Sequence, residues 1–206
     1  MKAVSIDKET INQMPRVSFQ GRIHVIDAIS QVRRAVAALR AVPVVGFDTE
    51  TRPCFRRGDR HNAALIQFST DADAFLFRIN KTGIPDELKH FLEDSQCIKV
   101  GLSTNDDFHQ IARLVEFHPD GFVELQQMVK EFDIADLSLQ KIYAILFRQK
   151  ISKGQQLTNW EAPQLTEQQQ QYAAIDAWAC LRIYNILRQS RFVPEESPYY
   201  HEIDQT

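Results

Sequence analysis

Hydrophobic residues in the first half of the chain are spaced as one helix followed by three strands. Between Asp27 and Arg40 they recur every three or four residues, as on one face of a helix, and Asp27 stands where an N-cap residue is expected. Short apolar runs at residues 44–47, 64–69 and 74–79 are typical of strands. Because no helix separates these three runs, antiparallel pairing between them is favoured.

The second half alternates helix and strand before it becomes mainly helical. The predicted elements are a helix from Pro85, a strand at 98–102 and helices at 107–117, from Ser138 and from Thr166. Thr166 and Gln169, three residues apart, have the spacing of a capping box. Such alternation is expected when crossover helices cover a sheet, so the sequence predicts a mixed α/β domain with a central sheet flanked by helices.

The chain shows few internal divisions. No repeat, low-complexity tract or Pro/Gly/Ser-rich linker interrupts it, and its 206 residues fit one ordinary domain. Residues 1–20 and 193–206 are polar enough to form an N-terminal arm and a C-terminal tail. We therefore predict a single domain at residues 21–192.

Composition excludes several classes of protein. The 24 Lys and Arg against 27 Asp and Glu give a net charge of -3, which argues against binding nucleic acid through bulk positive charge. The seven glycines provide neither G-x-G-x-x-G nor P-loop spacing, and G-x-S-x-G is absent. The three cysteines are isolated and the six histidines have no close His or Cys neighbour, so neither a disulfide framework nor a zinc site is expected.

No targeting or membrane segment is visible in the sequence. The N-terminus lacks the apolar run of a signal peptide, and no window approaches the roughly 18 apolar residues of a membrane span. We therefore expect an intracellular, cytoplasmic protein without a membrane partner.

Two carboxylates end the first predicted strand. Asp48 and Glu50 are two residues apart, so the period of a strand points both side chains to the same face. Paired carboxylates on a rigid strand suit a divalent cation, because hard cations such as Mg²⁺ prefer oxygen ligands. An isolated D-x-E pair is also common without a metal, but the apolar run before it suggests a central strand, where unpaired charges are costly to bury.

Two further acidic features follow. Tyr172 and Asp176 are four residues apart on the last predicted helix and share one face. Asp106 and Asp107 follow the apolar strand at 98–102. Each feature also has a simpler explanation: a half-buried ring beside a solvated charge in the first case, and favourable charges in the first turn of a helix in the second.

Taken together, these fragments resemble the DEDD superfamily of 3'-5' exonucleases. The shared order is D-x-E on a strand, an Asp at a following strand-to-helix junction, and Y-x-x-x-D on a late helix, the form found in the tyrosine-bearing (DEDDy) subgroup. The segments that resemble the ribonuclease D and Werner-type exonuclease branch are VGFDTE at 45–50, ALIQF at 64–68, KVG at 99–101, LTNW at 157–160, LT at 165–166 and YAAIDA at 172–177. The resemblance covers residues 21–192 and implies a ribonuclease H-like (DnaQ-like exonuclease) fold.

The resemblance also implies roles for five residues. Asp48, Glu50, Asp107 and Asp176 would be the ligands of two divalent cations, Mg²⁺ or Mn²⁺, and Tyr172 would help to orient the attacking water. The implied reaction is two-metal hydrolysis of phosphodiester bonds in DNA or RNA with a free 3' end, releasing nucleoside 5'-monophosphates. Bound cations make physical sense of the set, because four carboxylates converging without them would raise one another's pKa.

The choice between the two adjacent aspartates also comes from the resemblance. Spacing within the sequence alone leaves both Asp106 and Asp107 open. Asp107 stands six residues after Gly101 and four before Ile111, as in the Werner-type proteins, so it is the expected ligand.

Candidate contacts to nucleic acid lie in two segments. Arg56 and Arg57 belong to a basic stretch directly after the D-x-E strand, where they could engage backbone phosphates or simply be solvated. Lys150 and Lys153 form a second candidate rim, and Trp160 could stack on a base or anchor its loop in the core. The chain ends thirty residues after Asp176, without the helical nucleic-acid-binding domain of many ribonuclease D relatives, so we expect weak substrate grip or a protein partner that supplies it.

Two other functions fit parts of the pattern. A catalytically inactive nucleic-acid-binding module of the same fold would be expected to have lost an acid, whereas all four are present. Residues 47–51 faintly resemble the D-x-D-x-T loop of haloacid dehalogenase-like phosphatases, with Asp48 as nucleophile. Glu50 stands where that loop needs an Asp, and the Y-x-x-x-D helix would go unexplained.

Overall fold

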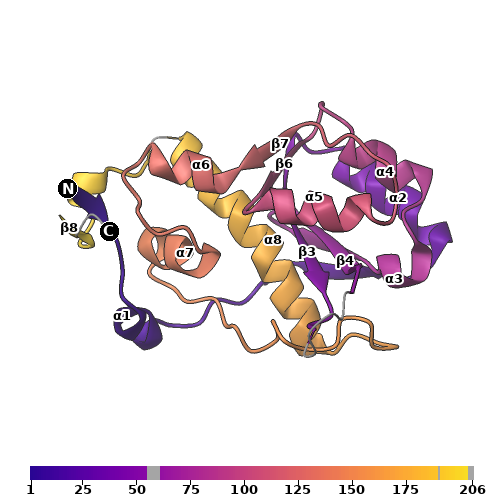
Figure 1. Cartoon of the computed structure of the whole chain (residues 1–206), viewed down its shortest axis with the longest axis horizontal. Helices are drawn as coiled ribbons and strands as arrows, with labels where there is room; N and C mark the ends of the chain where they lie inside the picture. The colour runs from indigo at the N-terminus through magenta and orange to yellow at the C-terminus, as the bar shows by residue number, and fades with distance from the viewer. Residues whose placement is uncertain (55–60, 190, 204–206) are drawn as a thin grey trace.

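The centre of the structure, a computed structural model that describes residues 1–54, 61–189 and 191–203, is a six-stranded sheet (Figure 1). Its strands are β2 (Arg22–Ile26), β3 (Val44–Thr51), β4 (Ala63–Ser69), β5 (Asp73–Phe77), β6 (Ile98–Gly101) and β7 (Phe122–Glu124). Their order across the sheet is β2-β5-β4-β3-β6-β7, which puts β2 and β7 at the edges.

The directions of the strands follow from the lengths of their connections. β3, β4 and β5 follow one another in the sequence and pair antiparallel, as predicted. β2 pairs parallel with β5, β3 with β6, and β6 with β7. The mixed central sheet predicted from the sequence is therefore confirmed.

Helices pack on both faces of this sheet. The described helices are α1 (Lys8–Gln13), α2 (Ile29–Leu39), α3 (Ile79–Thr82), α4 (Asp86–Leu92), α5 (Thr104–Ala112), α6 (Leu125–Lys130), α7 (Leu139–Phe147) and α8 (Glu167–Arg188), with a short 3-10 turn at Pro194–Glu196. α8 packs on β3 and β4 and also contacts α6 and α7, so it runs between the sheet and these two helices (Figure 1). Apolar side chains of α2, α4 and α5 pack on the opposite face. Within the described ranges, no helix is both long enough and apolar enough to cross a lipid bilayer.

The alternation of side chains along β3 positions the acidic residues. Phe47 is fully buried in the apolar cluster on the α2 side of the sheet. Because side chains alternate along a strand, Gly46, Asp48 and Glu50 face α8 instead. Gly46 has no side chain, which leaves room for the backbone of α8 to pack directly on β3.

Helix α5 differs from its predicted range. It spans Thr104–Ala112 rather than 107–117. Ser103 precedes it in a left-handed conformation with φ 61°, and the side chain of Glu124 accepts hydrogen bonds from the backbone N–H groups of Ser103 and Thr104. This cap comes from β7, so the local sequence could not reveal where the helix begins.

Two other predicted helix starts had different outcomes. The N-cap of α2 is Ala28, so the prediction of Asp27 was wrong. The side chain of Gln31 instead accepts hydrogen bonds from the backbone N–H groups of Asp27 and Ala28. At α8, Thr166 and Gln169 form the predicted capping box.

The two ends of the described chain lie close together (Figure 1). β1 (Lys2–Val4) pairs antiparallel with β8 (Tyr200–Glu202) in a separate two-stranded sheet. Val4 is fully buried and Phe19 is 3% exposed, and both belong to the apolar cluster that includes α8. The N-terminal segment, expected to be peripheral, therefore contributes to the core.

Candidate active site

Three carboxylates meet where α8 crosses β3. Asp48 and Glu50 come from one face of β3, and Asp176 comes from α8. One carboxylate oxygen of each residue lies within 4.8 Å of the others. Glu50 and Asp176 are 8% and 6% exposed. Two local patterns that are far apart in the sequence thus form one buried acidic group.

Asp107 is the fourth acid beside this group. It lies in the first turn of α5, and its Oδ1 accepts a hydrogen bond from the hydroxyl of Thr49, the middle residue of the D-x-E segment. Asp106 is exposed and lines a separate hollow on the surface. The structure therefore brings Asp107, and not Asp106, to the other acids.

Burial raises the pKa of all four carboxyls, and repulsion between them adds to the shift in three. Burial and then the charge of Asp176 raise the pKa of Asp48, while Glu50 responds to burial and then to the three other acids. Burial, followed by the charge of Asp48, raises the pKa of Asp107 to about 8. Burial raises the pKa of Asp176 to about 7. No described lysine or arginine forms an ion pair with any of them, so nothing in the described part of the chain balances their charge.

Tyr172 lies one helical turn before Asp176, and both residues line a pocket together with Asp48 and Glu50. Burial, followed by the negative charge of Asp176, raises the pKa of the Tyr172 hydroxyl above its ordinary value. The Tyr172 side chain opposes the effect of burial on the pKa of Asp176. Because its own pKa is raised, Tyr172 stays protonated beside the carboxylate.

A pocket of about 280 Å³ opens over Asp48, Glu50 and Asp176. Besides the three acids and Tyr172, its polar lining consists of Thr49, Ser138, Gln140, Lys153 and Gln156. Lys153 is the one lysine or arginine in the described lining. Ser138, Gln140 and Gln156 were not identified from the sequence, because no spacing links them to the acids. They reach the pocket only because α7 and the loop after it fold beside α8.

Three of the residues predicted to contact nucleic acid are not among the described residues that line the pocket. Arg56 and Arg57 lie outside the described residues. Trp160 is fully buried in a small apolar cluster with Leu65 and Leu165, and its ring centroid lies 6.0 Å from that of Tyr172. A base cannot stack on a ring that is already enclosed, so the prediction of a nucleic-acid contact for Trp160 was wrong. Its core position instead supports the tyrosine.

The ligand atoms around the pocket fit a hard divalent cation. The four carboxylates offer only oxygen, the element preferred by Mg²⁺ and Mn²⁺. The one sulfur in the described lining belongs to Cys180, and burial raises the pKa of its thiol. A neutral thiol is a poor metal ligand. The pocket therefore matches an oxygen-binding cation better than a thiolate-bound one.

Sequence comparison places this arrangement among known enzymes. Residues 23–190 match the family model described as 3'-5' exonuclease. A 3'-5' exonuclease of Arabidopsis thaliana is 30% identical over 199 residues, covering 84% of this chain and 66% of that protein. The bifunctional 3'-5' exonuclease/ATP-dependent helicase WRN of Mus musculus is 33% identical over 150 residues, covering 70% of this chain and 11% of that protein. The chain spans less than two thirds of the length of these relatives.

Solved structures share the architecture. The Nibbler EXO domain of Aedes aegypti aligns with a TM-score of 0.72 at 18% identity, covering 94% of this chain and 96% of that one. Escherichia coli RNase D aligns with a TM-score of 0.72 at 22% identity, covering 81% and 44% respectively. These similarities confirm the predicted ribonuclease H-like fold. Because the family match also runs through β3, α5 and α8, the elements that carry the four acids, the chain belongs to the 3'-5' exonuclease family of the DEDD superfamily.

Proposed function

We propose that this chain is a metal-dependent 3'-5' exonuclease of the tyrosine-bearing type, with its catalytic domain at residues 21–192. The observation that carries the proposal is the meeting of Asp48, Glu50 and Asp176 at one pocket. Asp107 is joined to the D-x-E segment through Thr49, and none of the four acids forms a described ion pair. Uncompensated buried charges lower the stability of a protein. Their convergence is therefore better explained by catalysis than by folding.

The four acids would together hold two divalent cations, Mg²⁺ or Mn²⁺. When bound, such ions lower the pKa of an attacking water and stabilise the charge that develops on the phosphoryl and leaving oxygens. The carboxylates must give up their protons to bind cations, and their raised pKa values make that exchange sensitive to pH near neutrality.

Tyr172 would position the attacking water. Its hydroxyl stays protonated beside Asp176, and the hydroxyl oxygen has lone pairs that can accept a hydrogen bond from water. A water held in one orientation loses less entropy on reaching the transition state. Because the pKa of Tyr172 is raised, it does this work as a neutral hydroxyl and not as a base.

Lys153 would contact a phosphate of the substrate. It lines the pocket of the acids and forms no ion pair with another described residue. An ammonium on a flexible side chain can follow a phosphate as the strand advances after each cleavage.

We further infer that the substrate is DNA or RNA with a free 3' end. A protein partner can strengthen substrate binding, since the chain itself is acidic.

The test is a time course on 5'-labelled single-stranded DNA and RNA of the same sequence, with Mg²⁺, Mn²⁺ or EDTA. We expect a ladder that shortens stepwise from the 3' end and releases nucleoside 5'-monophosphates. Asp48→Asn should abolish the ladder, as should EDTA. Asp106→Asn is the matched control, because Asp106 is exposed and lies outside the acidic group, so this variant should retain activity.

Two other outcomes would contradict the proposal. Binding of the oligonucleotides without cleavage in either metal would indicate an inactive binding module. Hydrolysis of a small phosphomonoester but not of either polymer would favour a phosphatase with Asp48 as nucleophile.

A further inference from the structure

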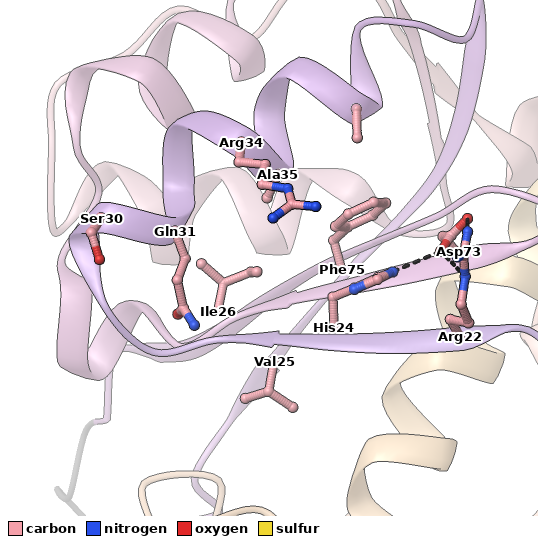
Figure 2. Close-up of a pocket in the computed structure, with 11 residues that line it drawn as sticks. Arg22, His24, Val25, Ile26, Ser30, Gln31, Arg34, Ala35, Asp73 and Phe75 are labelled. Atoms are coloured by element: carbon pink, nitrogen blue, oxygen red, sulfur yellow. Dashed lines mark hydrogen bonds and ion pairs between the residues drawn. The ribbon is translucent and has the colours of Figure 1, made fainter.

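A second pocket lies at the open edge of the central sheet. It is bounded by the edge strand β2 and by α2 and has a volume of about 590 Å³. Figure 2 shows its lining, which includes His24, Gln31, Arg34, Asp73 and Phe75. None of the four acids of the candidate active site lines it.

The register of the strands separates this pocket from the acids. His24, Phe75, Phe68 and Phe47 form one row across β2, β5, β4 and β3. Three strand spacings, roughly 14 Å, therefore separate His24 from Phe47. This row faces α2, whereas Asp48, the next residue of β3, faces α8. The two pockets thus belong to opposite faces of the sheet.

The one carboxylate in the described lining is already neutralised. Asp73 accepts hydrogen bonds from Nε and Nη2 of Arg22 at 3.0 and 3.1 Å, and its Oδ1 lies 2.6 Å from Nε2 of His24. Burial acts to raise the pKa of Asp73, but the hydrogen bonds from His24 and Arg22 outweigh it, and the pKa is lowered. Asp73 is therefore ionised and already paired with Arg22 and His24.

Arg34 supplies a positive charge that no described acidic residue pairs with. Its guanidinium extends from α2 toward Phe75 and His24 (Figure 2). It forms no ion pair with another residue in the described part of the chain. A guanidinium presents parallel N–H donors that match the oxygens of a phosphate.

Neutral donors lie next to this charge. Oε1 of Gln31 accepts hydrogen bonds from the backbone N–H groups of Asp27 at 3.0 Å and Ala28 at 3.1 Å. These bonds orient the amide, while its Nε2 has no described partner and can donate into the pocket. The hydroxyl of Ser30 is a further donor in the lining. Donors therefore outnumber free acceptors, which suits an anion.

An aromatic surface completes the pocket. The imidazole of His24 stacks on Phe75, with ring centroids 4.8 Å apart and planes inclined by 16°. The His24 side chain is 39% exposed, so part of the ring faces the pocket. Flat rings beside a guanidinium are a common way to hold a base together with its phosphate.

We propose that this pocket binds a phosphate-bearing nucleotide, with Arg34 and Gln31 on the phosphate and His24 against the base or sugar. The inference rests on the proposed function for the choice of ligand. The shared chemistry is a phosphate next to a flat ring, as a unit of a nucleic-acid strand or as a free nucleotide. A nucleic-acid strand bound here would have a second contact outside the catalytic pocket. Such a contact would offset the repulsion between the strand and a protein of net negative charge.

Arg33 offers a matched control for the test. It neighbours Arg34 on α2 and is also exposed, but it does not line the pocket. Dissociation constants of a labelled twelve-nucleotide strand and of a nucleoside 5'-monophosphate would be measured in EDTA. Arg34→Gln should weaken binding about fivefold or more and reduce the salt dependence of strand binding by about 0.7 in log–log slope. Arg33→Gln should change neither quantity.

Each outcome decides the proposal. A loss confined to the strand identifies a nucleic-acid contact, and a loss that extends to the mononucleotide identifies a nucleotide site. Equal affinities for the Arg34→Gln and Arg33→Gln variants, or no binding by the wild type, would overturn the proposal. Dinucleotide hydrolysis should be unchanged in Arg34→Gln, because this substrate is too short to reach beyond the catalytic pocket. A wild type that binds nucleotides here but cleaves nothing would contradict the proposed function and leave this site standing.

Discussion

Gly46 of β3 lies directly against the backbone of Ala177 in α8. A Cβ at position 46 would come within 1.7 Å of the carbonyl oxygen of Ala177, far inside any tolerable contact. The contact lies two residues before Asp48 on the strand and one residue after Asp176 on the helix. It therefore sets the separation of the two elements that carry these acids.

The first prediction concerns this contact. Gly46→Ala should push α8 away from β3, lower the free energy of unfolding by roughly 1–3 kcal/mol and reduce the rate of nucleotide release. Gly154→Ala is the control, since a Cβ there meets its nearest atom at 3.6 Å, an ordinary contact. Urea unfolding and exonuclease rates of both variants would be compared. A Gly46→Ala protein with wild-type stability and rate would show that the contact does not position the site.

Removal of one hydroxyl tests the role of Tyr172. Tyr172→Phe keeps the ring that packs near Trp160, so stability should be little changed. The rate constant kcat should fall roughly tenfold to hundredfold with little change in KM, because the water loses its orienting partner. The raised pKa of Tyr172 also predicts that wild-type activity shows no loss from tyrosine ionisation up to about pH 10, its ordinary pKa.

Tyr143→Phe provides the matched comparison for that variant. The Tyr143 hydroxyl is hydrogen-bonded to Arg182, and Tyr143 does not line the pocket of the acids. This second variant should retain kcat. An equal fall in both variants would point to a general loss of packing and not to water positioning.

The sequence was sufficient for the features that depend on local spacing. Asp48 and Glu50 share a face because a strand has a period of two, and Tyr172 and Asp176 share one because a helix brings residues four apart together. The capping box of Thr166 is local in the same sense. These patterns could be read without knowledge of what packs against them.

Features that depend on contacts between distant segments could not be predicted in this way. The start of α5 is fixed by Glu124, which pairs with Gly101 through the register of β6 and β7. The burial of Trp160 follows from its loop packing on the sheet, whereas the sequence favoured a core role only through the neighbouring leucines and left stacking on a base open. Spacing also could not decide whether Asp106 or Asp107 lies beside the other acids, because this depends on how the first turn of α5 is oriented.

Glu124 yields a prediction that no local pattern suggested. Its carboxylate accepts hydrogen bonds from the backbone N–H of Ser103 at 3.0 Å and of Thr104 at 2.8 Å, and so holds the first turn of α5, where Asp107 lies. Glu124→Gln should cost about 1–2 kcal/mol of stability. It should also raise the Mn²⁺ concentration needed for half-maximal activity, with kcat largely recovered at saturating metal.

A comparison with Glu131→Gln isolates this positioning role. Glu131 is exposed and follows α6, so its variant should match the wild type in both measurements. If Glu124→Gln lowered the melting temperature but left the metal requirement unchanged, Glu124 would stabilise the helix without positioning Asp107.

The raised pKa values predict how stability depends on pH when no divalent cation is bound. Folding raises the pKa of Asp107 to about 8 and that of Asp176 to about 7, from an ordinary value of 3.8. Between these limits the folded state binds more protons than the unfolded chain, so the free energy of unfolding falls as pH rises. The stabilising contribution is complete below about pH 4 and lost above about pH 8. Melting temperatures in EDTA should therefore decline across this range.

Divalent cations should reverse this trend, because they bind the deprotonated carboxylates of the folded state. The increase in melting temperature caused by Mn²⁺ should be larger at pH 8 than at pH 5. Asp176→Asn eliminates one buried charge and one metal ligand. The fall of the melting temperature with pH in EDTA should therefore be smaller in this variant, and most of the rise caused by Mn²⁺ should be lost. Asp106→Asn should behave as the wild type because Asp106 is exposed. Equal melting temperatures in Mn²⁺ and EDTA at pH 8 would mean that the buried acids do not form a metal site, and their convergence would need another cause.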